Sequence, residues 1–236
     1  MYAWCIPMLK RSFMVNVSLA AAIALFLSGC TLDHRQPIPY DAWTLNFFAP
    51  PYMEAWIETA DVVDINERVF RAAGSGGVTT GYPRALSKGI PAKFNGKPRG
   101  WAKHPSGSGR FVRGADLPRL VYVRWQSLVE PQTYEAYIEI PESARNSMLQ
   151  GERTFCRADG KWITDYRDML IVGLAPGGIA KVWLGGQCLL SNEVTRVQGT
   201  INPEGPYRGQ SDGEYYFLSE ESKAYVDKFG IPYGSW

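Results

Sequence analysis

Few side chains in this sequence have the type and spacing that catalysis or metal binding needs. Only one of the two histidines, His104, falls in the body of the chain, so a Ser-His-Asp triad would have to use it. Neither a Gly-x-Ser-x-Gly nor a His-Glu-x-x-His pattern occurs. Three carboxylate pairs could supply an acid and a base, Asp61 with Asp64, Asp165 with Asp168 and Glu220 with Glu221, but turn, surface or helix-cap chemistry explains each better. We therefore expect a binding protein, not an enzyme, with no metal site and no cofactor.

The cysteines carry more specific chemistry. Cys30 directly follows Leu-Ser-Gly, and this tetrad resembles the bacterial lipobox, in which the cysteine is lipidated and becomes the first residue of the mature chain. Cys5 would be removed with the signal, which leaves Cys156 and Cys188 as an even pair. In an oxidising compartment we predict a disulfide between them, the alternative being two buried thiols. A loop of that length would contribute roughly 3–4 kcal/mol in the chain-entropy model.

The segment before Cys30 predicts export. An apolar run over residues 15–27 follows Lys10 and Arg11 and is too short for a comfortable membrane span. We predict a lipoprotein signal peptide at residues 1–29 and a tether at 30–41, which two prolines keep semi-extended. The lipid on Cys30 would hold the protein at a membrane. Because Thr31 does not suggest inner-membrane retention, we expect the periplasmic face of the outer membrane.

The rest of the chain predicts a mainly β fold. Apolar and polar residues alternate in many short segments. We expect one antiparallel β-sandwich over residues 42–236, with two short helices at 141–150 and after Ser219. The strands are expected at residues 43–47, 53–58, 62–70, 120–128, 134–140, 170–175, 179–184, 194–201 and 215–218.

Two local features of the sandwich can also be predicted. Residues 120–128 and 134–140 should pair as a hairpin, which would set Arg124 near Glu135 or Glu139 on the outer face. Residues 155–165, which hold Cys156, are expected to form a polar loop.

An inserted loop over residues 74–115 differs from its surroundings, because it is rich in Gly and Pro and has no acidic residue. With Arg71 it carries a charge of +9, and the signal carries +2, so the formal net of +2 leaves −9 for the remaining chain. Such opposed charge steers association. Either charged region could bind a partner, and carboxylates of the acidic body could mimic a phosphate. Of the two we favour the loop, through Lys93, Lys97, Arg99, Trp101, Lys103, His104, Arg110 and Arg113, with Trp101 as the anchor.

The residues alone do not decide which partner this loop binds. Phe94, Trp101 and Phe111 interleave with the basic residues as in nucleic-acid sites, although no nucleic acid is expected in the periplasm. Anionic lipid headgroups and an acidic protein groove are the other partners considered. The alternative that the loop is simply solvated and binds no partner is given as much weight as these three partners together.

Several segments resemble a family of proteobacterial lipoproteins that is catalogued as a domain of unknown function and is common in pseudomonads. They are the lipobox, Ala42-Trp43, Leu117-Pro118, the run from Leu120 to Glu130 with its Trp-x-Ser-Leu-x-Glu motif, and the ending from Glu221 to Trp236. Some such lipoproteins are similar to immunity proteins of type VI secretion systems, which protect the periplasm from phospholipase effectors, including the phospholipase D type. The resemblance implies a lipoprotein that inhibits such an effector by binding it. The alternative is a non-catalytic envelope lipoprotein that binds peptidoglycan, lipid or another envelope protein.

Overall fold

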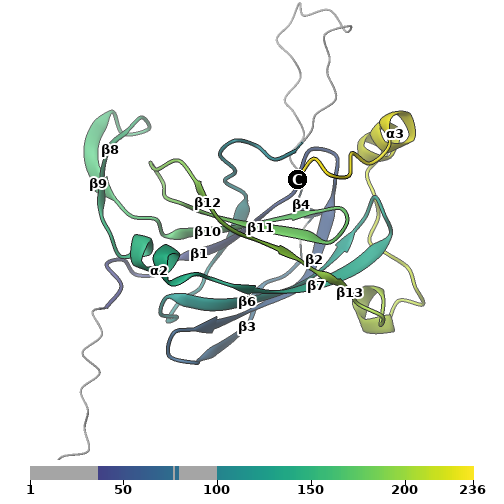
Figure 1. Ribbon diagram of the computed structural model, residues 1–236, viewed down its shortest axis with the longest axis horizontal. Coiled ribbons are helices and arrows are strands. Elements are labelled where there is room, and N and C mark those ends of the chain that lie inside the picture. Colours follow the sequence, from purple (N-terminus) through teal and green to yellow (C-terminus); the bar gives the residue numbers. More distant parts are fainter. Residues whose placement is uncertain (1–36, 77, 80–99) are drawn as a thin grey trace, which may run out of the picture. The chain divides into compact units, whose positions relative to one another are not determined.

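The structure is a computed structural model that describes residues 37–76, 78–79 and 100–236. The chain divides into two units, Met1–Pro37 and Ile38–Trp236, and only the second is described at length. In that unit, two β-sheets pack face to face around one core (Figure 1). Ile38 and Tyr40 already pack against this core, within the stretch predicted to be a tether. The predicted signal peptide and Cys30 lie outside the described residues.

The first sheet has the strand order β12-β11-β10-β1-β5. Its strands are β1 (Thr44–Phe48), β5 (Ser108–Phe111), β10 (Met169–Ala175), β11 (Ile179–Gly185) and β12 (Asn192–Gln198). All neighbours are antiparallel except β1 and β10, which pair in parallel with Thr44 opposite Met169. Segments from opposite ends of the chain therefore lie side by side in this sheet.

The second sheet is fully antiparallel and has the order β13-β7-β6-β2-β3, with a short strand β4 also paired to β2. Its strands are β2 (Ala55–Asp64), β3 (Val69–Gly74), β4 (Val78–Thr79), β6 (Pro118–Ser127), β7 (Gln132–Glu139) and β13 (Thr200–Ile201). The predicted hairpin is the pair β6 and β7, with Arg124 opposite Glu135.

Alternation along the strands builds the core. Leu45 and Phe47 of β1 point inward from the first sheet, and Val121, Val123 and Trp125 of β6 point inward from the second. All five are buried, and burying side chains of this size contributes roughly 1.5–3 kcal/mol each. The inward face of each sheet is thus apolar, which leaves the outward faces for polar side chains and binding.

Elements outside the two sheets mark the ends of the sandwich. They are α2 (Glu142–Met148), α3 (Glu220–Phe229), the 3-10 turn η3 (Pro206–Gly209) and a separate hairpin of β8 (Glu152–Cys156) and β9 (Lys161–Asp165). The β8–β9 hairpin stands out from one end, and α3 lies at the other (Figure 1). Among the residues described, no helix combines the length and apolar character needed to cross a membrane.

The predicted fold class is confirmed: the protein is mainly β, sandwich-like and mostly antiparallel, with two short α-helices. Ser219 caps α3 as expected, because its hydroxyl accepts a hydrogen bond from the Ser222 backbone N–H at 3.2 Å.

Several local predictions were wrong. Residues 155–165 form most of a hairpin and not a loop, and residues 215–218 are not a strand because they lie beside no sheet edge. The strand expected at 62–70 is instead the end of β2, a turn and the start of β3. The loop expected over 74–115 contains β4 and β5, while residues 80–99 lie outside the described part. Residues 194–201 form two strands, β12 and β13, one in each sheet.

Arg124 lies opposite Glu135 across the hairpin, as predicted. Its ion pairs, however, are with Glu58 and Glu204, and its side chain is buried. The loop after β13 covers this outward face, so the buried cation takes the carboxylates that the loop and β2 bring to it.

Candidate functional site

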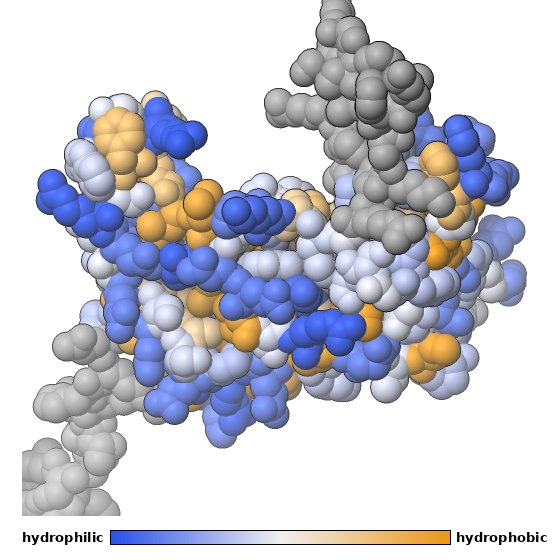
Figure 2. All heavy atoms as spheres, turned by 45° about the horizontal axis from the view of Figure 1, so that its top comes forward, coloured by the Kyte–Doolittle hydropathy of each residue, from blue (hydrophilic) through white to orange (hydrophobic). Residues whose placement is uncertain are grey.

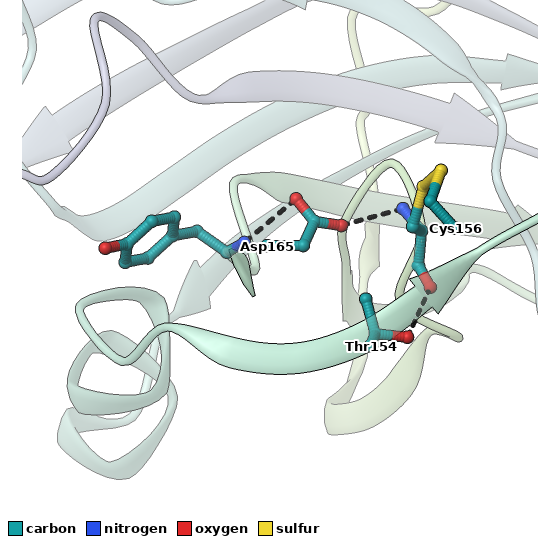
Figure 3. The surroundings of a disulfide bond; sticks show 5 residues. Thr154, Cys156 and Asp165 are labelled. Carbon is teal, nitrogen blue, oxygen red and sulfur yellow. Dashed lines mark hydrogen bonds between the residues drawn. A yellow bond between two sulfur atoms is a disulfide. The ribbon is translucent and has the colours of Figure 1, made fainter. Parts of the chain in front are cut away.

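The projecting β8–β9 hairpin is fixed to the sandwich by the predicted disulfide. Cys156 at the end of β8 is bonded to Cys188, which follows β11 (Figure 3). The backbone of Cys188 also holds the hairpin, because its N–H donates to Asp165 Oδ2 at 2.7 Å and its carbonyl accepts from Thr154 Oγ1 at 3.3 Å. One covalent bond and two hydrogen bonds therefore join both hairpin strands to one loop.

Arg167 adds a second clamp at the base of the hairpin. Its Nε donates to Glu152 Oε1 at 2.5 Å and its Nη2 to Glu152 Oε2 at 3.2 Å, the two-pronged pairing that suits a guanidinium. Its Nη1 donates to the carbonyls of Leu184 at 3.1 Å and Leu190 at 3.0 Å. Because Arg167 is buried, loss of this side chain would leave several polar groups unpaired. The hairpin is thereby presented in one orientation.

The outward face of this hairpin is aromatic and cationic. Phe155 and Trp162 stand directly opposite each other, with ring centroids 5.8 Å apart in an edge-on arrangement. They are 46% and 62% exposed, which is high for such large rings. The Arg153 guanidinium lies 5.8 Å from the Trp162 ring, and Arg157, just after β8, is exposed. Lys161 is also exposed, but it lies opposite Cys156 on the other face of the hairpin. Figure 2 shows hydrophobic and hydrophilic surface side by side on this projection.

Such a face has the chemistry of an interface anchor. Trp and Arg dominate the binding energy of protein interfaces, and an element held rigid before binding loses less entropy when it docks. We define Arg153, Phe155, Arg157 and Trp162 as the ribbon face.

The basic residues predicted to bind a partner are divided by the structure. Lys93, Lys97 and Arg99 lie outside the described residues. Lys103, His104, Arg110 and Arg113 are all exposed.

Trp101, the expected anchor, is half-buried and packs against two other aromatic rings. Its ring lies 5.2 Å from that of Trp183 and 6.2 Å from that of Phe48, centroid to centroid. This packing requires glycine at position 173, because a Cβ there would lie only 2.7 Å from the indole rings of both Trp101 and Trp183. Trp101 therefore covers the outward face of the first sheet, and its ring is not freely presented to a partner.

Two of the remaining basic residues, Arg110 and Arg113, lie on or next to the edge strand β5. Arg110 lies on β5, the last strand of the first sheet, and Arg113 lies 5.5 Å from the exposed ring of Phe111. Among the described side chains no carboxylate forms an ion pair with Arg110 or Arg113. His104 makes a 3.2 Å contact through Nδ1 with the Ser191 carbonyl. We name Arg110 and Arg113 the basic edge.

Comparison with known proteins places this fold in a family. A family model described as "Protein of unknown function (DUF2931)" matches residues 31–234. The chain belongs to the DUF2931 family. The match includes the ribbon face, the basic edge and both cysteines of the disulfide. No curated protein and no solved structure matches the chain.

Two of the carboxylate pairs of this DUF2931 protein hold its backbone. Asp64 accepts hydrogen bonds from the N–H groups of Asn66, Arg68 and Asp116 at 2.9–3.1 Å, and Asp61 accepts one from Ala72 at 2.8 Å. These contacts agree with the turn chemistry predicted for the pair.

The second pair also binds backbone. Asp165 accepts from the N–H groups of Tyr166 and Cys188. Burial, and then the nearby charge of Asp165, raise the pKa of Asp168. In the described part of the chain, no three His, Cys, Asp or Glu side chains form a group that could hold a metal ion.

Sequence reasoning missed the ribbon face, although a signal was present. Asp159-Gly160 sits between two short segments that carry Phe155 and Trp162, and an Asp-Gly pair between such segments favours a β-hairpin. Gly160 takes a positive φ of 64° and its N–H donates to the Cys156 carbonyl at 2.8 Å. The many polar residues around this turn favoured the loop interpretation instead.

Proposed function

We propose that this DUF2931 protein is a lipid-anchored immunity protein of the periplasm, which binds and inhibits a phospholipase effector delivered by type VI secretion. An effector of the phospholipase D type is one such partner. The resemblance to lipoproteins of this kind supports the proposal. The observation that carries it is the ribbon face, a rigid aromatic and cationic projection on a sandwich.

The ribbon face suits insertion into the mouth of an enzyme. Phe155 and Trp162 can fill an apolar cleft that otherwise admits lipid chains, and Arg153 and Arg157 can pair with acidic groups at its rim. The disulfide and the Arg167 clamp hold the face ready, so little ordering is needed on binding. Inhibition then follows because substrate cannot enter an occupied cleft.

The lipid on Cys30 would place the inhibitor where its target works. Pro37 lies seven positions after Cys30, a reach of at most about 25 Å. The inhibitor would then stay close to the periplasmic face of the outer membrane, the surface that a phospholipase must approach. The basic edge would attract an acidic effector during this approach.

Co-purification with the phospholipase encoded beside its gene tests the function. We expect a complex with nanomolar or tighter affinity and loss of phospholipid hydrolysis when the two proteins are mixed in equal amounts. Failure to bind any co-encoded effector would contradict the proposal.

Substitutions in the ribbon face test the proposed contact. Trp162→Ala and Phe155→Ala should each weaken the complex roughly 30-fold or more, as loss of a central aromatic anchor does. Phe217→Ala is the matched control, because Phe217 is an exposed aromatic outside the hairpin and should leave the affinity unchanged. Wild-type inhibition by both hairpin variants would place the interface elsewhere.

A further inference from the structure

A polar pocket lies on the outward face of the second sheet, apart from the ribbon face. Its volume is about 420 Å³. It is lined by Tyr122, Arg124, Glu135, Asn202, Pro203, Glu204 and Arg208. These residues come from β6, β7 and the loop after β13, so the wall of the pocket depends on how that loop is held.

A buried ion-pair network holds the loop over the sheet. Arg124 is 2% exposed and donates from Nε to Glu58 at 2.7 Å, from Nη1 to Glu204 at 2.9 Å and from Nη2 to the Gly205 carbonyl at 2.6 Å. Glu58 also accepts from the Tyr207 backbone N–H at 2.7 Å. Buried ion pairs are often no more stabilising than apolar residues of similar size. Stability alone is therefore a weak reason for this network, and positioning of the loop is a better one.

The loop is held in a strained conformation. Tyr207 and Arg208 are neighbours that both have positive φ, 51° and 57°, although neither is Gly or Asn. Residues in this region cost of order 1–3 kcal/mol each and are often found at functional sites. The result of the strain is that Arg208 lines the pocket. No carboxylate among the described residues forms an ion pair with Arg208.

The opposite wall offers an acceptor and an aromatic surface. Glu135 Oε2 accepts hydrogen bonds from Tyr122 Oη at 2.9 Å and Asn202 Nδ2 at 2.8 Å, which leaves Oε1 able to accept from a ligand. Burial, and then this bond to Glu135, raise the pKa of Tyr122 to about 12, so its hydroxyl stays a donor at neutral pH. Tyr137 is not part of the pocket lining but lies next to it: its ring centroid is 4.9 Å from that of Tyr122, and its side chain is 65% exposed.

The charged residues in and beside the pocket indicate which class of ligand it can bind. The charged residues that line the pocket are Arg124, Arg208, Glu135 and Glu204, so the formal charge of the lining is zero, and the buried Glu58 behind Arg124 adds −1. The pocket therefore has no excess of positive charge to attract phosphate groups or anionic lipids. A flat ring, a free carboxylate oxygen and a free guanidinium instead suit an uncharged molecule with many hydroxyl groups.

We propose that this pocket binds an uncharged glycan. One sugar ring stacks its apolar face on Tyr137, Glu135 accepts hydrogen bonds from hydroxyl groups, and Arg208 donates to a hydroxyl or acetamido oxygen. The site is independent of effector inhibition, and it gives an envelope protein a second contact besides its lipid. Strands of the cell wall and free oligosaccharides share this chemistry.

Calorimetry with the purified protein tests the pocket. The probes are chitotetraose, which carries acetamido groups, maltotetraose, which does not, and inorganic phosphate. We expect saturable binding of at least one oligosaccharide and none of phosphate. Co-sedimentation with isolated peptidoglycan sacculi would identify the wall as the source, and binding of soluble sugar without it would identify free oligosaccharides. Binding of phosphate, or of neither sugar, would overturn the proposal.

Two variants separate binding from folding. Arg208→Gly should keep or raise the temperature of unfolding, because Gly adopts positive φ without strain, yet weaken sugar binding at least about tenfold. Tyr137→Ala removes an exposed ring and should have the same effect on binding. Trp162→Ala is the control and should bind sugar like the wild type. Unchanged binding in Arg208→Gly and Tyr137→Ala would place any sugar elsewhere and overturn the assignment.

Discussion

Single residues in this protein are used chiefly to join segments that are distant in the sequence. Glu130, the last residue of the Trp-x-Ser-Leu-x-Glu motif, accepts hydrogen bonds from the Gly177 N–H at 2.9 Å and from the Tyr233 hydroxyl at 2.8 Å. Trp125, the first residue of the motif, lies in the core. The motif therefore secures the β10–β11 turn and the C-terminal segment, in agreement with a structural role.

Asp64 is the residue at which acid should act on stability. Its carboxylate is buried, and burial acts to raise its pKa, but hydrogen bonds from Arg68, Asp116 and Asn66 outweigh this and lower the pKa overall. Its contribution is then present above the pKa of an unfolded Asp, about 3.9, and is lost as the pH falls through the lower folded pKa.

Asp64→Asn should therefore lower the free energy of unfolding by about 2–4 kcal/mol at pH 7, because it breaks the ion pair between the buried carboxylate and the half-exposed Arg68 and weakens several hydrogen bonds. Urea unfolding at pH 7 and at about pH 3 measures the effect, and the gap between variant and wild type should shrink in acid. A gap of the same size at both values would contradict the assignment.

Residue roles were only partly predictable from the sequence. Cysteine count and compartment predicted the Cys156–Cys188 bond, which the structure contains. The packing of Trp101 on Trp183 could not be predicted, because it depends on the tertiary placement of a Gly on a distant strand. The number of Lys and Arg residues in the loop likewise does not indicate which of their side chains form no ion pair in the fold.

At the scale of elements, the β8–β9 hairpin is a two-stranded ribbon that cannot be stable by its own pairing alone. The disulfide and the Arg167 clamp supply the stabilisation that pairing with a third strand would otherwise give. Strands with a buried face were predicted well, since their alternation is strong. This ribbon has no face in the main core, and so its pattern was weak.

Replacing both cysteines, Cys156→Ser with Cys188→Ser, should lower the free energy of unfolding by roughly 2–4 kcal/mol and also weaken effector binding, because the ribbon face is no longer held. Urea unfolding with and without reductant, beside inhibition assays, measures both effects. Thr154→Val removes one hydrogen bond to Cys188 and serves as a control with a loss of only about 1 kcal/mol. Equal unfolding midpoints with and without reductant would refute this role.

The whole molecule combines a basic edge with a body whose remaining formal charge is negative. Such a distribution acts over distances comparable to the Debye length, about 8 Å at physiological salt. It should therefore affect how fast an effector is captured more than how long it stays.

For the proposed complex, Arg110→Ala with Arg113→Ala should slow association about tenfold at low salt and leave dissociation nearly unchanged. Surface plasmon resonance at about 20 and 200 mM salt measures this, and the variant should show the weaker salt dependence. Trp162→Ala should do the opposite and speed dissociation. Faster dissociation in the arginine variant would mean that the basic edge is part of the bound interface.

Sheet topology was the least predictable level. Local alternation identifies strands but not their neighbours, and nothing near β1 in the sequence indicates that it pairs with β10 on one side and β5 on the other. Residues 194–201 are likewise divided between two sheets by tertiary contacts, because β12 pairs with β11 and β13 pairs with β7.

The parallel pairing of β1 with β10 has a consequence for how the protein is made. Thr44 finds its partner only when Met169 has been synthesised, so the first sheet cannot close while the chain is still emerging N-terminus first. Contacts that span so much sequence make folding slow. An exported chain would therefore complete its fold only after most of it had left the cytoplasm, and until then its apolar strands would depend on chaperones for protection from aggregation.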